Sequence, residues 1–190
     1  MFKIVEFSHV LISNHLNNLN KDNIIVVDAT CGNGNDSLFI ANCLNNKGTL
    51  VCYDIQQIAI NNTKLLLESN NYYNVIYKLT SFENISEIPD LVIYNCGYLP
   101  GSDKSIKTTS NQTLNSISKI TNLINQNEHL LIIIVLYPGH SEGKIESELI
   151  DDWCFNLSSK EYLVCKYQNY NRPTSPYILT ISKNIIKKQN

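Results

Sequence analysis

The chain has 190 residues, 43% of them hydrophobic and 17% charged, which fits one ordinary globular domain and excludes an intrinsically disordered chain. Its net charge of −2 excludes an overall basic field for nucleic acid, so any RNA contact must use a local patch. No apolar run approaches the roughly 18–20 residues of a membrane helix, and residues 1–10 lack the apolar stretch of a secretory signal. We therefore expect a cytoplasmic protein with no membrane partner.

Strand and helix patterns alternate along the chain. In chain order we expect a helix over 4–19, a strand over 24–28, a helix over 36–44, a strand over 49–54, a helix over 56–69, strands over 75–79 and 91–95, a helix over 113–124, a strand over 129–137, a helix over 142–157, and strands over 161–168 and 177–182. This alternation predicts an α/β fold with a seven-stranded, mostly parallel sheet. The link between the last two strands is too short for a crossover, so they should form a C-terminal antiparallel hairpin. We expect a single domain over 1–190, with the first helix packed on it.

Glycine and cysteine are used selectively. The six cysteines form no CxxC pair and match no zinc pattern, so we expect reduced thiols and no metal site. Six of the seven glycines form close pairs that each follow a predicted strand: 32 with 34, 97 with 101, and 139 with 143. Ligands of open α/β sheets bind outside the carboxyl ends of the strands, so these loops are candidates for a ligand site. The alternative is that the glycines only make turns.

The loop after the first strand, residues 28–36, has the features of a nucleoside-cofactor site. Gly32 and Gly34 would let backbone amides at the start of the next helix face a ligand. Ser37 stands where dinucleotide enzymes need Gly or Ala, which argues against NAD. Asp28 suits a cationic ligand, such as the amino group of S-adenosylmethionine (SAM), and would repel a pyrophosphate. Asp54, 20 residues past Gly34, can accept both ribose hydroxyls.

Two further loops extend this candidate site. Ser81 and Phe82 follow the third strand, where the adenine would lie, so Phe82 could flank the ring and Ser81 bond its edge; alternatively, Phe82 is a core residue. The fourth strand ends in Asn95-Cys-Gly-Tyr98, the Asn-x-x-Tyr spacing of amino-methyltransferase loops. Asn95 could accept the hydrogens of a neutral amine nucleophile, and Tyr98 could stack on a base turned out of its helix. A turn role for Asn95 and a packing role for Tyr98 are the alternatives.

The remaining candidates are polar residues of three loops. Asp103 and His140 could accept or relay a proton, although a solvated loop and a structural turn explain them equally well. The candidates for phosphate and RNA contact are Lys104, Lys107, Gln168, Asn169 and Arg172. A solvated loop or hairpin tip is the alternative for these residues.

Together these motifs resemble a known family, the class I methyltransferases of the putative rRNA methylase type. The resemblance rests on Asp-Ala-Thr-x-Gly-Asn-Gly-x-Asp at 28–36, Asp-Ile-Gln at 54–56, Asn-x-Gly-Tyr-Leu-Pro-Gly-x-Asp-Lys-Ser at 95–105, Tyr-x-Gly-His at 137–140 and the Gln-Asn…Asn…Pro hairpin at 168–176. It covers nearly the whole chain. The chain departs from the family's pattern at Cys31, Asn35 and 81–82, which affects the adenine-loop details.

The resemblance implies a Rossmann-like fold and a SAM-dependent enzyme. The implied reaction methylates the 5-aminomethyl group of 2-thiouridine at the tRNA wobble position, giving 5-methylaminomethyl-2-thiouridine. It implies cofactor contacts from Asn33, Asp36, Asp54, Gln56, Ser81 and Phe82, and Asn35 of the same loop is a further candidate for cofactor binding. The implied partner is the anticodon arm of tRNA, and a homodimer is left open. The alternatives are an rRNA or small-amine methyltransferase, and a nucleotide-binding module or NAD oxidoreductase without methyl transfer.

Overall fold

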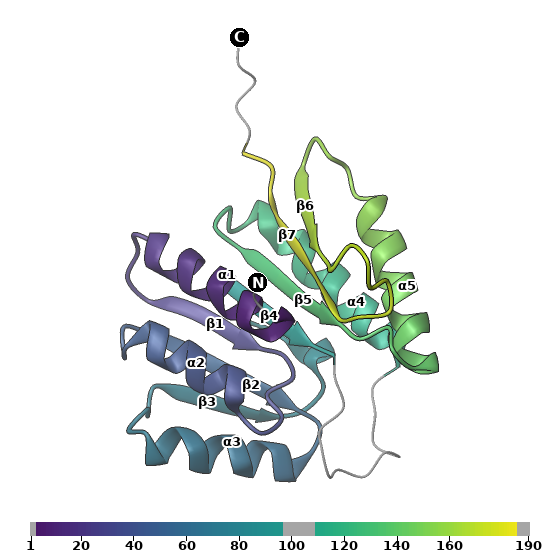
Figure 1. Ribbon diagram of the computed structural model, residues 1–190. Helices are drawn as coiled ribbons and strands as arrows, with labels where there is room; N and C mark the ends of the chain where they lie inside the picture. Colours follow the sequence, from purple (N-terminus) through teal and green to yellow (C-terminus); the bar gives the residue numbers. More distant parts are fainter. Residues whose placement is uncertain (1–2, 97–108, 186–190) are drawn as a thin grey trace.

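The computed structural model describes residues 3–96 and 109–185, and its centre is a seven-stranded sheet (Figure 1). The strands are β1 (Ile24–Asp28), β2 (Gly48–Asp54), β3 (Val75–Leu79), β4 (Leu91–Asn95), β5 (Leu131–Leu136), β6 (Tyr162–Tyr167) and β7 (Tyr177–Lys183). Their order in the sheet is β3-β2-β1-β4-β5-β7-β6. The first five strands are mutually parallel, whereas β7 is antiparallel to both β5 and β6. The predicted α/β fold, the mostly parallel sheet and the C-terminal antiparallel hairpin are thus confirmed.

Helices cover both faces of this sheet. They are α1 (Ile4–Asn18), α2 (Asn35–Leu44), α3 (Gln57–Ser69), α4 (Ser110–Thr121) and α5 (Ser141–Phe155), with short 3-10 helices η1 (Phe82–Asn84) and η2 (Asn122–Asn125). Buried side chains of α1, α2 and α3 form one core cluster with the sheet, and those of α4 and α5 form the other (Figure 1). Strands β1, β4 and β5 are covered on both faces, which explains why their sequences are almost continuously apolar.

Several element boundaries differ by a few residues from the predicted ones, and two of these differences have identifiable reasons. Helix α4 begins at Ser110 because Thr109 and Gln112 form a capping box, in which the Thr109 hydroxyl accepts the Gln112 N–H and the Gln112 side chain accepts the Thr109 N–H. Strand β5 begins at Leu131 because a turn at Asn127 occupies the two residues before it. The backbone N–H of His129 donates to Asn127 Oδ1, and that of Leu130 donates to the Asn127 carbonyl.

The direction of β7 decides which loops lie together. Leu136 at the end of β5 pairs with Tyr177 at the start of β7, so the turn 168–176 lies at the carboxyl edge of the parallel strands. The 28–36 loop, Asp54 and Asn95 lie at the same edge. The topology therefore brings the predicted candidate loops of the described chain to one side of the sheet.

A buried carboxylate, Asp90, lies at the opposite edge of the sheet, where the parallel strands begin (the amino edge). Asp90 is fully buried before β4, and its oxygens accept from Lys21 Nζ at 2.7 Å, Ile25 N at 2.9 Å and Asn127 Nδ2 at 2.9 Å. His15 of α1 bonds the Asp90 carbonyl oxygen at 3.0 Å. This edge is fixed by paired and hydrogen-bonded groups.

Among residues 3–96 and 109–185, no helix has the length and apolar character needed to cross a bilayer.

Candidate functional site

The loop between β1 and α2 needs its glycines for the conformation it adopts. Gly32 has φ 52° and Gly34 φ 83°, both in the left-handed region, and Gly34 N donates to the Cys31 carbonyl at 2.8 Å. A Cβ at Gly34 would lie 2.9 Å from Thr63 Cα, and the Thr63 hydroxyl donates to the Gly32 carbonyl at 3.0 Å. The loop is therefore a tight turn held against α3, and a side chain at Gly34 would push it away.

Two carboxylates beside this loop lack a basic partner in the described structure. Asp28 is buried and accepts from the Ser37 hydroxyl at 2.6 Å and from Thr30 N at 3.2 Å. Burial first, and then the nearby charge of Asp36, raise the pKa of Asp28 to about 7. Asp54 accepts from Gly32 N at 3.0 Å and Gln56 N at 2.9 Å, and its burial raises its pKa as well. This edge of the sheet therefore favours a positively charged ligand.

The Asn95 side chain lies at the centre of a hydrogen-bond network at the end of β4. Its Nδ2 donates to Asp36 Oδ2 at 2.8 Å, and its Oδ1 accepts from the Tyr137 hydroxyl at 2.8 Å. A carboxylate only accepts, so the orientation of the Asn95 amide follows from its partners. Thr30 fixes the backbone, since its hydroxyl accepts from Asn95 N at 2.9 Å and donates to Asn95 O at 3.2 Å. The Asn95 amide is thus held in one orientation, and among the described residues only Tyr137 bonds its Oδ1.

Three members of this network were missed by the sequence reasoning. His9 bonds Asp36 Oδ1 through Nε2 at 2.7 Å, Thr30 bonds the Asn95 backbone, and Tyr137 bonds the Asn95 side chain. Tyr137 was visible in the Tyr-x-Gly-His motif, and Thr30 in the motif at 28–36, but neither was given a role. His9 lies 27 residues from Asp36, and no spacing in the sequence connects the two.

The other predicted cofactor residues follow β1 and β3 and are partly or fully exposed, with one exception. Asn33 and Asn35 are exposed, and Asn33 Oδ1 accepts from Asn62 at 3.1 Å. The Ser81 hydroxyl caps η1 by accepting Glu83 N at 3.2 Å. The exception is Phe82, whose ring is only 4% exposed and packs edge-on against Tyr94 with 5.7 Å between the ring centroids. The structure therefore favours the core role of Phe82 over the predicted role beside the adenine.

His140 has a structural role in this conformation. It is the N-cap of α5, and its Nδ1 accepts the Gly143 N–H at 3.0 Å. A Cβ at Gly143 would lie 2.2 Å from the Tyr137 carbonyl, so this glycine serves the turn. The capping bond supports the turn alternative for His140 and uses only Nδ1, so the proton relay stays a prediction. Four predicted site residues, Tyr98, Asp103, Lys104 and Lys107, lie outside the described residues.

The predicted substrate contacts in the β6–β7 turn lie at the same edge as Asn95. Gln168 Nε2 donates to the Pro173 carbonyl at 3.1 Å, and Arg172 N donates to the Asn169 carbonyl at 3.0 Å. Arg172 itself is exposed. A Cβ at Gly139 would lie 3.6 Å from the Thr174 carbonyl, which places the turn beside the loop that follows β5. The turn is internally bonded and presents polar groups next to the site.

A seven-stranded Rossmann-like sheet with this final hairpin is the class I methyltransferase fold, and comparisons with known proteins agree. The family model described as Putative rRNA methylase matches residues 50–183. The chain is 31% identical to the chloroplastic tRNA (mnm(5)s(2)U34)-methyltransferase of Arabidopsis thaliana, over 83% of this chain and 62% of that protein. The chain therefore belongs to the putative rRNA methylase family, as the motif resemblance predicted. It spans less than two thirds of the length of the Arabidopsis relative.

Two solved structures of bacterial proteins share the fold over almost the whole chain. The structure of a putative rRNA-methylase from Clostridium thermocellum has a TM-score of 0.84 and 30% identity, covering 96% of this chain and 99% of that one. A putative methyltransferase from Streptococcus mutans, solved in complex with SAH, has a TM-score of 0.78 and 27% identity with the same coverage.

Proposed function

We propose that the protein is a SAM-dependent methyltransferase that N-methylates the 5-aminomethyl group of 2-thiouridine at the wobble position of tRNA. The observation that carries this proposal is the fixed Asn95 amide at the end of β4, on the same edge as Asp28 and Asp54, which have no basic partner among the described residues. The name of the Arabidopsis relative supports the substrate, since mnm(5)s(2)U34 is the methylated form of this nucleoside.

The carboxyl edge fits SAM because its charges complement those of the cofactor. SAM carries an ammonium group and a sulfonium, and when bound it supplies the methyl group as an electrophile. Burial and, after it, the charge of Asp36 raise the pKa of Asp28, and a cation bound nearby would stabilise its ionised form. In this proposal Gly32, Asn33, Gly34, Asn35 and Asp36 form the wall of the cofactor site, and Asp54 bonds the ribose. Gln56 and Ser81 line its nucleoside end. The SAH in the Streptococcus mutans structure is the form of SAM that has lost its methyl group, which supports the same choice.

Asn95 orients the attacking amine in this mechanism. A primary amine has a pKa near 10 and is a nucleophile only when neutral. The lone pair of Asn95 Oδ1 that no described residue uses would accept one N–H of the amine and so direct the nitrogen lone pair toward the methyl group. The N–C bond would form as the S–C bond breaks, and the methylated nitrogen would then lose a proton to water. Most of the rate enhancement then comes from positioning, because one amide fixes the direction of attack.

The anticodon arm of tRNA would reach this site along the edge that carries the β6–β7 turn. Gln168, Asn169 and Arg172 contact the RNA in this proposal, and Arg172 suits a phosphate because its guanidinium can donate two parallel hydrogen bonds. The predicted contacts of Tyr98, Asp103, Lys104 and Lys107, the cytoplasmic location and the homodimer stay predictions.

Methyl transfer to defined RNAs tests the proposal. The purified protein is incubated with methyl-labelled SAM and with tRNA that carries 5-aminomethyl-2-thiouridine, and the nucleosides are separated and weighed by mass spectrometry. We expect label only in 5-methylaminomethyl-2-thiouridine, and none in matched tRNA that lacks the aminomethyl group. The family's description makes rRNA the second candidate. Label in rRNA but not in the aminomethyl tRNA would favour that candidate, and label in neither RNA would refute both.

A further inference from the structure

His9 of the N-terminal helix reaches into the network of Asn95 from outside the strand-end loops. Its Nε2 lies 2.7 Å from Asp36 Oδ1, and its ring stacks on Phe39 with 4.0 Å between the ring centroids and an interplanar angle of 8°. The side chain of His9 is 24% exposed and that of Asp36 only 11%. His9 therefore enters the network from a pocket between α1 and α2.

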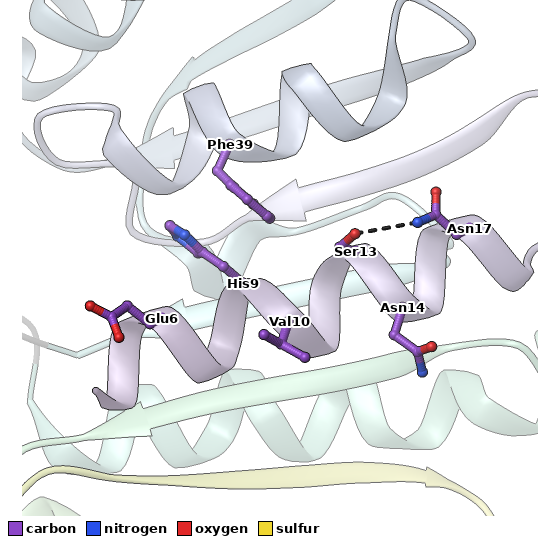
Figure 2. A pocket seen from close by; sticks show the side chains of 7 residues that line it. All are labelled: Glu6, His9, Val10, Ser13, Asn14, Asn17 and Phe39. Atoms are coloured by element: carbon purple, nitrogen blue, oxygen red, sulfur yellow. Dashed lines mark hydrogen bonds between the residues drawn. The ribbon is translucent and has the colours of Figure 1, made fainter. Parts of the chain in front are cut away.

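Figure 2 shows this pocket, where the rings of His9 and Phe39 face each other. The pocket has a volume of about 610 Å³, and the other side chains that line it come from α1: Glu6, Val10, Ser13, Asn14 and Asn17. Helix α1 is anchored below it by the buried residues Ile4, Ser8, Ile12 and Leu16, which recur every fourth residue. The stacked ring and this anchored helix fix the position of His9.

The two oxygens of Asp36 are divided between two partners. Oδ1 bonds His9, and Oδ2 accepts from Asn95 Nδ2 at 2.8 Å. Since a carboxylate only accepts hydrogen bonds, Nε2 of His9 carries the proton in this pair. Asn95 in turn bonds Tyr137, so the carboxylate links α1 to the ends of β4 and β5. Without His9, Asp36 would lose the bond that prevents its carboxylate from rotating away from Asn95.

We propose that His9 is a positioning residue for methyl transfer: it holds Asp36 so that Asn95 presents Oδ1, and not Nδ2, to the amine. This inference rests on the proposed function for its kinetic consequence, whereas its structural content, the control of Asn95 by His9, is independent of it. A misplaced Asn95 amide would lower the rate of the chemical step and leave the binding of cofactor and RNA nearly unchanged.

Three variants on the same helix test the role of His9. His9→Ala removes the bond to Asp36, and His9→Gln restores an N–H donor of similar reach. His15→Ala is the matched control, because His15 is a second α1 histidine whose Nε2 bonds a backbone carbonyl at the amino edge of the sheet. We expect His9→Ala to lower kcat by about 10- to 100-fold, with KM for tRNA and Kd for SAH each within about three-fold. His9→Gln should recover most of kcat, and His15→Ala should lower Tm without lowering kcat.

An NMR measurement without catalysis separates this inference from the proposed function. Exchange of the Asn95 Nδ2 protons in ¹⁵N-labelled protein should be slow in the wild type and in His15→Ala, and much faster in His9→Ala. Unchanged exchange in folded His9→Ala would overturn the inference, as would an unchanged kcat. If the wild type methylated no RNA, the proposed function would fail, and the exchange rates would still decide whether His9 controls Asn95.

Discussion

The two edges of the sheet each bury a carboxylate, and they treat it in opposite ways. Asp90 at the amino edge is fully buried and is bonded to the Lys21 ammonium and to two N–H donors. Asp28 at the carboxyl edge is only 1% exposed, but its donors are one hydroxyl and one backbone N–H, and its charged neighbours are Asp36 and Asp54. Burial is nearly the same at both positions, whereas the charge compensation differs.

This difference separates a carboxylate whose charge the fold compensates from one whose charge the described residues do not compensate. Removing a carboxylate from water costs several kcal/mol unless a cation or enough donors replace the water. At Asp90 the fold itself supplies this compensation. At Asp28 it does not, and the pKa rises to about 7 because the ionised form is disfavoured. A cationic ligand at the carboxyl edge would supply the positive charge that the described residues do not place beside Asp28.

The largest effect that we expect comes from a substitution at the carboxyl edge that lowers turnover and leaves cofactor binding nearly unchanged. Asn95→Ala removes the acceptor that directs the amine, so turnover of aminomethyl tRNA should fall by about 100-fold or more. The affinity for SAM should stay within a few-fold, because Asn95 contacts the amine and not the cofactor in this mechanism. Single-turnover methylation and calorimetric titration measure the two quantities. Retained turnover would remove Asn95 from the mechanism.

The corresponding change at the amino edge should affect stability alone. Asp90→Ala leaves the N–H of Ile25 without its acceptor and Lys21 without its ion-pair partner, and the Asn127 amide keeps only its bond to the Pro89 carbonyl. We expect a loss of about 3 kcal/mol, which corresponds to a decrease in Tm of about 6–12 °C for a chain of this length. Thermal unfolding measures this loss, and kcat per folded molecule should be unchanged. If Asp90→Ala were fully folded and its kcat were still much lower, the amino edge would contribute to the reaction as well as to stability.

A third change tests the cofactor contact that we assign to Asp54. Asp54→Ala removes the acceptor of the ribose hydroxyls and of the Gly32 N–H, so Kd for SAM should rise by about 10- to 100-fold, the cost of one or two hydrogen bonds to a charged group. Asp152→Ala is the control, since it removes the same charge from an exposed position on α5. Calorimetry that shows equal affinities for the two variants would refute the ribose assignment.

The sequence predicted the strand ends of this site better than the connections among them. Asp28, Asp54 and Asn95 could be predicted together because each ends a recognisable parallel strand, and the carboxyl ends of parallel strands share one edge. His9 could not, because its bond to Asp36 depends on how α1 packs across α2, and no periodicity encodes that packing.

The direction of a single side chain is a second limit of sequence reasoning. Phe82 follows β3 at the start of η1, where an aromatic ring can point toward a ligand or into the core with the same local sequence. Its inward direction is set by contacts that lie far away in the chain: the ring packs on Tyr94, and the Phe82 carbonyl accepts from the Ser116 hydroxyl at 3.0 Å. His140 shows the same limit. Its bond to the Gly143 N–H depends on α5 beginning directly after it, and the sequence pattern did not fix that boundary.

The smallest effect that we expect is a proton released when the cofactor binds. In the folded protein without ligand the pKa of Asp28 is about 7, whereas its ordinary value is 3.8. Between these two values the unfolded chain has lost the proton and the folded chain retains it, so the contribution of Asp28 to stability is greatest below pH 4 and is lost as the pH rises through 7. A bound cation favours the ionised form and lowers this pKa, so binding at pH 7 should release about half a proton.

Calorimetry of SAM binding in two buffers of different ionisation enthalpy measures this release. Asp28→Asn keeps the shape of the side chain and removes its titration, so it should abolish the release while changing Kd only a few-fold. It should also remove the loss of stability between pH 4 and pH 7, which gives a second readout in the absence of ligand. If Asp28→Asn released as many protons as the wild type, Asp28 would not be the source of the proton. The contrast between Asp28 and Asp90 would then fail, because it requires that the ligand, and not the fold, compensates the charge of Asp28.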